Sequence, residues 1–259
     1  MTVPLTYLQV HLVFILPPIL VLGWLAYRHD NAWWGLKPLS GLAIMIVLAV
    51  VYTTPWTNHL IPAGVWWYGE GAVIGHIWHT PIEEYMFFVL QPILTAFWLF
   101  HIPKIADRSL YIPLRHRIAG IVGGLAVGAI GLYLTLGTAT YYLGWLLLWA
   151  GPILAIQWGF GCTYLWQIRR TVAVAIAVPT LYLWIVDWTA IELGVWVISE
   201  THTVGITLFG LPIEEALFFL VTNVFLVQGI TLYLWLLDRT HEVPTLTTFL
   251  RRSVNPDGR

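Results

Sequence analysis

Seven long apolar runs occupy most of this 259-residue chain. They fall at residues 5–27, 39–54, 81–102, 117–136, 142–166, 171–187 and 211–237. A helix that crosses a bilayer needs roughly 20 mostly apolar residues, and these runs are of about that length. Only 10% of the residues are charged, whereas a soluble domain carries about 25% and needs them to cover its surface. The sequence therefore predicts an all-α integral membrane protein with seven transmembrane helices, and we expect no cleaved signal peptide because the first run is long enough to span.

The basic residues fall only in alternate connections between these runs. In chain order they are Arg28, Lys37, Lys104, Arg108, Arg115, Arg117, Arg169, Arg170, Arg239, Arg251, Arg252 and Arg259. In a seven-span topology all of them lie on one side, and the positive-inside rule makes that side cytoplasmic. We therefore expect the N-terminus outside and the C-terminus inside, in a multi-pass protein of the cell membrane.

A group of acidic residues lies on or near the opposite side, without basic partners. Its members are Glu70, Glu83, Glu84, Asp187, Glu192, Glu200, Glu214 and Glu215. Carboxyl groups at membrane depth are costly and rare, so each of those inside a span is a functional candidate.

The chain contains an internal repeat. Residues 64–70 and 194–200 both begin Gly-Val-Trp and end in Glu, and after a gap both copies continue with Pro-Ile-Glu-Glu and a Phe-Phe pair. Farther upstream, Pro18-Ile19-Leu20 matches Pro152-Ile153-Leu154. Spans one to three and five to seven are therefore predicted to be copies of one three-helix unit. The fourth, glycine-rich span is the extra crossing that makes the two units parallel and places both Glu pairs on one face.

This organisation predicts the division of the chain. We expect a first three-helix repeat at 1–103, a linking loop and helix at 104–140, a second repeat at 141–238, and a cytoplasmic tail at 239–259.

The purely structural interpretation of the Glu pairs is helix capping. Thr80, Pro81 and Glu83 have the order of a capping box, which would explain Glu83. In the second copy Leu211 precedes the proline and cannot cap, yet both glutamates are present. Capping explains neither Glu84 nor Glu215.

The chemical interpretation is acid–base catalysis. Successive helical residues point about 100° apart, so one Glu of each pair can face the bundle interior while its neighbour supports the helix terminus. Two copies bring up to four carboxyls toward one cavity. Like charges that close in a poor solvent cannot all ionise, so at least one is expected to keep its proton beside another that has lost it.

Aromatic residues accompany both Glu pairs. Rings one turn deeper, together with tryptophans of the preceding loops, could line an apolar pocket and stabilise a passing cation, although packing and an interfacial belt are ordinary alternatives. The predicted lining comprises Phe87, Phe88, Phe218, Phe219, Trp66 and Trp196.

Other chemistries receive little support. His76, His79 and Glu83 could suggest a metal site, but Pro81 interrupts the helix that would align them and the second copy has no such histidines. The lone Cys162 forms no disulfide within the chain. No nucleotide fingerprint and no basic patch for nucleic acid is present.

The doubled motif resembles a known family, the membrane lycopene β-cyclases of the heterodimeric type in their fused, archaeal form. The matching residues are Pro81-Ile82-Glu83-Glu84 and Pro212-Ile213-Glu214-Glu215, and the resemblance covers about residues 1–240. In bacteria of this class the two halves are separate subunits, and in fungi the domain is fused to phytoene synthase. Asp187-Trp188 also looks like family pattern, but Pro55 replaces the aspartate in the first copy, so we expect the halves to differ in role.

The resemblance implies carotenoid biosynthesis. An acid protonates the terminal double bond of lycopene, the neighbouring double bond closes a six-membered ring, and a base removes a proton whose position decides between β and ε rings. The products would be γ-carotene and β-carotene. The implied acid–base set is Glu83, Glu84, Glu214 and Glu215 with Asp187 as a partner, and no cofactor is expected because no flavin site is present. The expected partners are lycopene, other long polyene hydrocarbons and membrane lipid; which carboxyl donates, and the oligomeric state, stay open.

A proton-coupled transporter is the main alternative, because intramembrane carboxylates in a duplicated fold suit a proton pathway. A retinal-based pump is excluded because Lys37 and Lys104, the two lysines of the chain, lie in predicted loops. A prenyltransferase would need an Asp-rich diphosphate motif, which the sequence lacks.

Overall fold

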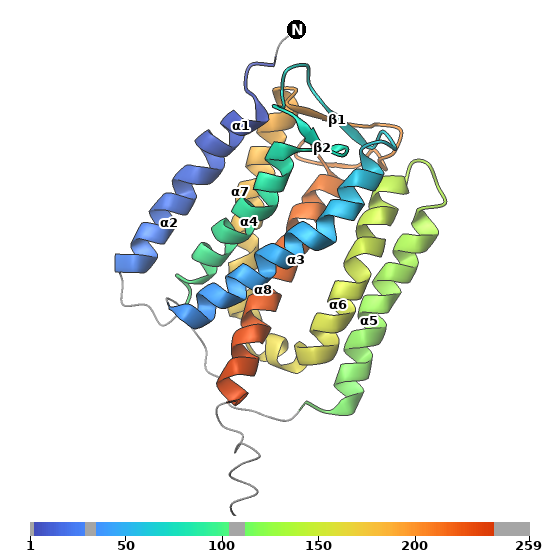
Figure 1. The fold of residues 1–259 in the computed structure, drawn as a ribbon. Helices are drawn as coiled ribbons and strands as arrows, with labels where there is room; N and C mark the ends of the chain where they lie inside the picture. The colour runs from blue at the N-terminus through green and yellow to red at the C-terminus, as the bar shows by residue number, and fades with distance from the viewer. Residues whose placement is uncertain (1–2, 29–34, 104–111, 241–259) are drawn as a thin grey trace, which may run out of the picture.

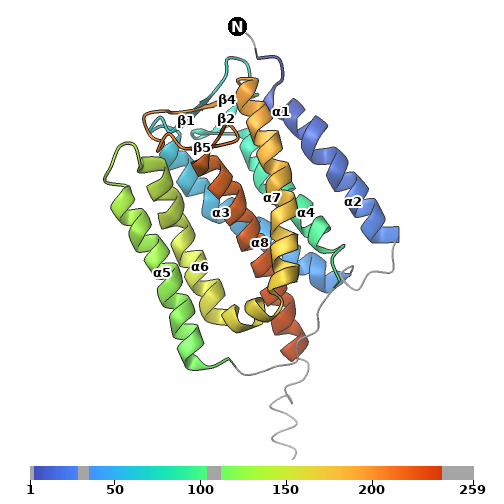
Figure 2. The same cartoon turned by 180° about the vertical axis from the view of Figure 1, so that it is seen from behind.

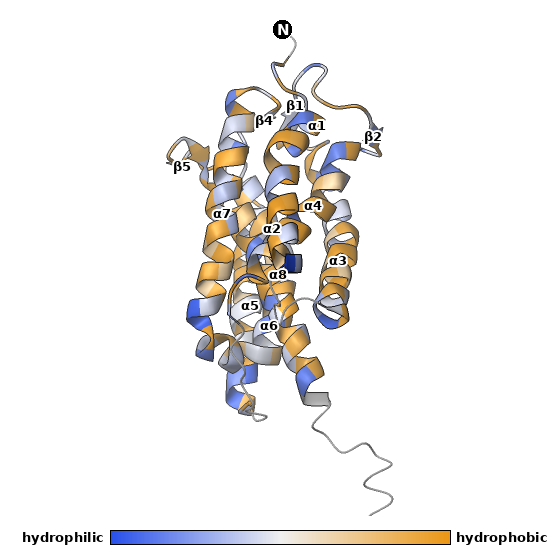
Figure 3. Ribbon diagram, turned by 90° about the vertical axis from the view of Figure 1, so that its left-hand side faces the viewer, coloured by the Kyte–Doolittle hydropathy of each residue, from blue (hydrophilic) through white to orange (hydrophobic). Residues whose placement is uncertain are grey.

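The computed structural model describes residues 3–28, 35–103 and 112–240 of the chain, with side chains described up to residue 238. Seven helices of this part are long and apolar enough to cross a membrane. The elements are α1 (Tyr7–Val10), the π-helical turn η1 (His11–Ile15), α2 (Leu16–Arg28), α3 (Leu36–Leu60), β1 (Trp66–Tyr68), β2 (His76–Ile77), β3 (Thr80–Pro81), α4 (Ile82–Leu99), α5 (Leu114–Leu134), α6 (Tyr141–Gln167), α7 (Arg169–Glu192), β4 (Trp196–Ile198), β5 (Thr207–Leu208), β6 (Leu211–Pro212) and α8 (Ile213–Thr240). The predicted all-α, seven-span fold is confirmed, and apolar residues predominate along the helices in the foreground, such as α2, α3 and α7 (Figure 3).

Two predicted helix ends were wrong. The second span continues from the predicted end at 54 to Leu60, because Pro55 is accommodated inside α3. The sixth continues past Asp187 to Glu192. Asp187 does not end this helix: its side chain is buried in the bundle and accepts a hydrogen bond there.

The first span contains one wide turn. The amide of Leu16 donates to the carbonyl of His11, five residues earlier, as in a π-helix. Pro18 has no N–H to donate to the carbonyl of Phe14, four residues before it. The hydroxyl of Tyr182 in α7 donates to that carbonyl instead, at 2.5 Å. The wide turn thus directly precedes Pro17 and Pro18, and a side chain from a neighbouring helix satisfies the carbonyl that Pro18 leaves open.

All six short strands lie at one end of the bundle, the end from which α1 begins (Figure 1). β2–β3 and β5–β6 are hairpins directly before α4 and α8, while β1 pairs with β4 of the other repeat. In that antiparallel pair Trp67 lies opposite its counterpart in the other copy, Val197. On either side, Trp66 pairs with Ile198 and Tyr68 pairs with Trp196, so the pattern is the same when the two copies are interchanged. Such self-matching pairing is what a two-fold relation between the copies produces. The domain boundaries themselves stay a prediction.

The described basic residues lie at the other end of the bundle. Arg28 ends α2, Lys37 lies in the first turn of α3, Arg115 and Arg117 in that of α5, and Arg169 and Arg170 begin α7. The predictions made for Lys104, Arg108, Arg251, Arg252, Arg259 and for most of the tail fall outside the described residues. The one-sided charge distribution therefore holds for the described side chains, while the orientation of the termini stays a prediction.

A polar network links the two Glu-bearing helices deep in the bundle. The side-chain oxygen of Asn223 in α8 accepts hydrogen bonds from Gln91 and Thr95 of α4, at 3.1 and 2.6 Å. Its amide nitrogen donates to Thr180 of α7 at 3.0 Å. Interhelical hydrogen bonds of this kind hold helices together in lipid, where apolar contacts give no preference over lipid tails. The network fixes α4, α7 and α8 relative to one another.

Glycines bring α5 into close contact with α6 at the edge of the bundle (Figure 1, Figure 2). A Cβ added at Gly124 would lie 2.1 Å from the backbone nitrogen of Ala155, and one at Gly131 would lie 2.2 Å from that of Leu148. The close packing of this fourth span depends on small residues that let two backbones approach.

Adjacent glycines of α5 give a direct test of this packing. We expect Gly124→Ala to lower the free energy of unfolding by about 1–3 kcal/mol, because overpacking of a tight contact has that cost. Gly123→Ala is the matched control, because its Cβ would meet the Trp158 ring at an ordinary 3.6 Å. Thermal unfolding of both variants in detergent measures the difference, and equal stability of the two would contradict it.

Candidate active site

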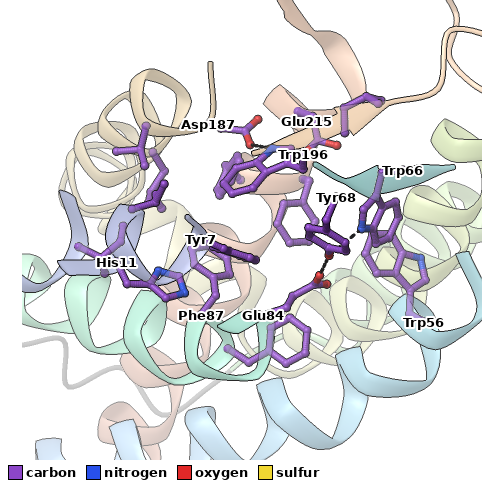
Figure 4. Close-up of a pocket in the computed structure, with 18 of the residues that line it drawn as sticks. Tyr7, His11, Trp56, Trp66, Tyr68, Glu84, Phe87, Asp187, Trp196 and Glu215 are labelled. Carbon is purple, nitrogen blue, oxygen red and sulfur yellow. Dashed lines mark hydrogen bonds between the residues drawn. The ribbon is translucent and has the colours of Figure 1, made fainter. Parts of the chain in front are cut away.

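A small cavity lies just below the paired strands, between α1, η1, α3, α4, α7, α8 and the start of α6. Its volume is about 70 Å³. Figure 4 shows the side chains that converge on it. The lining residues are Tyr7, Val10, His11, Ile15, Trp56, Trp66, Tyr68, Glu84, Phe87, Phe88, Tyr142, Leu183, Val186, Asp187, Trp196, Ile198, Glu215, Phe218 and Phe219. We call this cavity the acid pocket.

Three carboxyl groups line the acid pocket, and no lysine or arginine is among its lining residues. Glu84 and Glu215 occupy matching positions in the first turns of α4 and α8. Asp187 comes from α7 and is 2% exposed, with its Oδ2 atom buried and unpaired. Charged groups buried without a cation need hydrogen-bond donors.

Each of these carboxyls receives one hydrogen bond from an aromatic side chain. Tyr68 of β1 donates to Glu84, and Tyr142 at the start of α6 donates to Glu215 at 2.7 Å. The indole nitrogen of Trp196 in β4 donates to Asp187 at 3.0 Å. The strand layer and the start of α6 therefore supply the donors.

Tyr68 can act as a donor over a wide pH range. Burial, reinforced by the charge of Glu84, raises the pKa of the Tyr68 phenol well above its ordinary value. A second hydrogen bond reaches the same hydroxyl from the indole of Trp66 at 3.0 Å. The phenol therefore keeps its proton and points it at Glu84.

The other two motif glutamates face away from the acid pocket. Glu83 accepts a hydrogen bond from the backbone amide of Ile74 at 2.7 Å, and Glu214 accepts one from Val204 at 2.8 Å. Both side chains are fully buried. Each therefore ties the loop before its helix to the first helical turn. Of the four predicted carboxyls, the structure brings two together in the pocket, with Asp187 as the third.

The capping-box interpretation of Glu83 is wrong. The N-cap of α4 is Pro81, which makes no side-chain cap. Thr80 belongs to β3, and its hydroxyl lies 2.9 Å from that of Thr57 in α3. The hairpin continues directly into the helix. The carboxyl of Glu83 therefore accepts its hydrogen bond from the loop amide of Ile74 and not from an N-cap residue.

All six predicted aromatic residues line the acid pocket. Phe87 and Phe219 meet edge to face at 6.0 Å between ring centroids, and Phe218 stacks on Trp56 at 5.7 Å and 2°. A cation formed in this space would meet ring faces on several sides, which stabilise positive charge.

A larger apolar cavity adjoins the acid pocket and shares Phe87, Phe88 and Phe218 with it. Its volume is about 370 Å³, between α3, α4, α6 and α8. Leu48 and Ile156 in its wall are also exposed on the helix surfaces that face outward. We call this cavity the apolar chamber; it reaches from the acid pocket toward the lipid-facing surface.

Sequence reasoning missed five aliphatic lining residues and five that carry a ring, the latter being Tyr7, His11, Trp56, Tyr68 and Tyr142. Tyr68 lies inside the repeated segment and Trp56 follows the position matched to Asp187, so the repeat could have indicated both. Tyr7, His11 and Tyr142 have no motif around them, and only helix packing brings them to the pocket.

The histidines considered for a metal site lie elsewhere. His76 is exposed in β2, and His79 is exposed in the turn before β3. Among the described residues, no group of three or more His, Cys, Asp or Glu side chains could hold a metal ion.

Fold and site together define a class: a seven-span membrane protein whose two repeats enclose buried acids and aromatic rings beside a lipid-accessible chamber. Sequence comparison gives the family. The lycopene cyclase family profile matches residues 4–102 and 133–236, which is most of the chain. This chain belongs to the lycopene cyclase family.

Individual relatives agree. A lycopene beta-cyclase of Halobacterium salinarum is 44% identical over 235 residues, covering 90% of this chain and 98% of that protein. A bifunctional lycopene cyclase/phytoene synthase of Arthroderma gypseum is 36% identical over 87% of this chain, which spans 41% of that longer protein. The corresponding protein of Gibberella fujikuroi is 34% identical over 96% of this chain and 45% of its own length. No solved structure matches.

The anchoring role of Glu83 predicts an effect on stability. We expect Glu83→Ala to lower the free energy of unfolding by about 1.5–3 kcal/mol, because the variant loses a buried hydrogen bond to a carboxylate. Glu200→Ala, at an exposed loop position, is the control and should change it by less than about 0.5 kcal/mol. Denaturant titration in micelles measures both, and an unaffected Glu83→Ala variant would remove the anchoring role.

Proposed function

We propose that this protein converts the acyclic ends of lycopene into β-ionone rings by acid–base chemistry inside the membrane, giving γ-carotene and then β-carotene. The observation that carries the proposal is the acid pocket itself, with three carboxyls and no cation among its lining residues. The family assignment and the relatives' names supply the substrate. Nothing in the site specifically favours a transporter.

The reaction needs an acid, a cation-stabilising surface and a base. A carboxyl donates its proton to the terminal double bond, the neighbouring double bond attacks the resulting cation and closes the ring, and a base then removes a ring proton. Aromatic faces stabilise the cation between these steps. Protonation and deprotonation cancel and no oxidation state changes, so the proposal requires neither a metal nor a redox cofactor.

The geometry divides the predicted acid–base set. We assign the reacting groups to Glu84, Glu215 and Asp187, which line the pocket, and a supporting role to Glu83 and Glu214, which hold the loops. Asp187 is the preferred donor, because its buried Oδ2 has no protein partner and a protonated carboxyl offers one O–H. The first copy has Pro55 at the matching position, so the two halves would contribute differently.

The apolar chamber suits the long hydrocarbon. An engineered cavity of about 150 Å³ in another protein admits benzene, so a chamber of about 370 Å³ can hold a stretch of polyene. The acid pocket, at about 70 Å³, is small and must widen around an end group by movement of its rings. In this arrangement lycopene enters from lipid with its end in the acid pocket and its chain in the chamber.

Carboxamide variants test the assigned carboxyls. In a lycopene-accumulating bacterium the wild-type chain should convert lycopene to cyclic carotenes. Asp187→Asn should lower conversion by at least about 100-fold, because a general acid contributes 10²–10⁴. Glu84→Gln and Glu215→Gln should each lower it by about 100-fold, because each removes a carboxylate that offsets the charge of the cation. Pigments are separated by chromatography and protein levels followed by immunoblot.

Glu200→Gln is the control for these variants, because its side chain lies at an exposed loop position. Unchanged lycopene with well-expressed wild-type protein would reject the cyclase proposal. Full activity in Glu84→Gln and Glu215→Gln would reject only the roles of those two residues.

A matched pair of alanines in α3 tests the chamber. Ala49 lines it, whereas Ala43 is exposed on the same helix. We expect Ala49→Phe to fill the chamber and lower the rate of lycopene conversion at least tenfold, while Ala43→Phe leaves it unchanged. Initial rates in liposomes measure both, and equal rates would place the polyene elsewhere.

A further inference from the structure

One residue of the acid pocket carries a lone pair that no protein group uses. His11 is 1% exposed, and its Nε2 atom lies 2.8 Å from the backbone carbonyl of Glu83. A carbonyl oxygen has no hydrogen, so Nε2 must donate. A neutral imidazole has one N–H, and Nδ1 therefore carries the free lone pair. That atom is buried and has no hydrogen-bond partner.

The chain places His11 there by a local irregularity. His11 is the first residue of η1, the wide turn that precedes Pro17 and Pro18. π-helical turns are frequent at functional sites. Aligning Pro18 with Pro152 places Trp145 opposite His11 in the second copy, where α6 has no such turn. The histidine and its turn are therefore additions to the first copy and not part of the repeated scaffold.

His11 lines the acid pocket, and its ring lies beside Phe87, one of the three rings at the junction of that pocket with the apolar chamber. Its ring is stacked near that of Phe87, with 6.2 Å between centroids and 12° between planes (Figure 4). Phe87 is a wall of both cavities. With an end group in the pocket and its chain in the chamber, the ring carbon that bears the chain lies at this junction.

The ring type depends on which carbon loses its proton. After ring closure the positive charge is on the methyl-bearing ring carbon. Loss of a proton from the adjacent carbon that bears the chain gives a β ring, whereas loss from the ring methylene gives an ε ring. A base beside Phe87 lies on the side of the ring that carries the chain, and so faces the first of these protons rather than the ring methylene.

We propose that Nδ1 of His11 is the base that takes this proton, an assignment that rests on the proposed function. The C–H electron pair becomes the ring double bond and the proton forms an N–H bond, which converts the neutral imidazole to imidazolium. The Phe87 ring face and the carboxylate left by the donor offset this charge. Return of the proton to that carboxylate resets the site, so neither electrons nor protons are consumed.

Replacement of His11 tests this role. His11→Gln and His11→Asn keep an amide N–H that can donate to Glu83 but lack a basic nitrogen. We expect β-ring formation in the full-length protein to fall about 100-fold, and the rings still formed to include a larger share of ε type. Initial rates in lycopene-loaded liposomes and chromatography of the products give both values, normalised to protein amount.

His101→Gln is the matched control. His101 is a half-buried histidine whose ring also bonds a backbone carbonyl, that of Phe97, but it does not line the pocket. Rates within tenfold of wild type and an unchanged ring ratio in either folded His11 variant would overturn the assignment, as would an equal loss in His101→Gln. A wild-type protein without cyclase activity would instead reject the proposed function itself.

Discussion

The site depends on two hydrogen bonds between loop amides and buried carboxylates. Glu83 and Glu214 bind the backbone of Ile74 and Val204, and so fix the first turn of α4 and α8 against the hairpins before them. Because the next residue points about 100° away, Glu84 and Glu215 then turn toward the interior. One carboxylate of each pair thus stabilises the geometry in which its neighbour meets the acid pocket.

The pairing of β1 with β4 brings these two sites into one pocket. Residues at the centre of each strand lie opposite each other, which places the copies about a two-fold relation. Deeper in the bundle, Asn223 holds α4 and α8 together through Gln91 and Thr95. Strand pairing above and polar contacts below keep the facing carboxyls at fixed positions without any cation among the pocket residues.

The symmetry is broken where the chemistry is proposed. Asp187 has Pro55 as its first-copy counterpart, and His11 has Trp145 as its second-copy counterpart. Cyclisation requires one group to give a proton and another to take one, at different carbons of the same end group. A pocket with two identical halves would offer the same groups on both sides. Because Asp187 and His11 each occur in one copy only, the proposed donor and the proposed acceptor are different groups on different sides of the pocket.

The sequence by itself determined the seven spans, the internal repeat, the one-sided basic residues and the doubled Pro-Ile-Glu-Glu motif. These follow from hydropathy, charge placement and duplication, which are properties of the order of residues along the chain. The sequence distinguished Glu83 from Glu84 only through a capping box that α4 does not contain, and the loop amide of Ile74 is what separates the two. Tyr7, His11 and Tyr142 carry no motif. Their place in the pocket follows from the wide turn at His11 and from the packing of α1 and the start of α6 around the pocket, which tertiary structure alone decides.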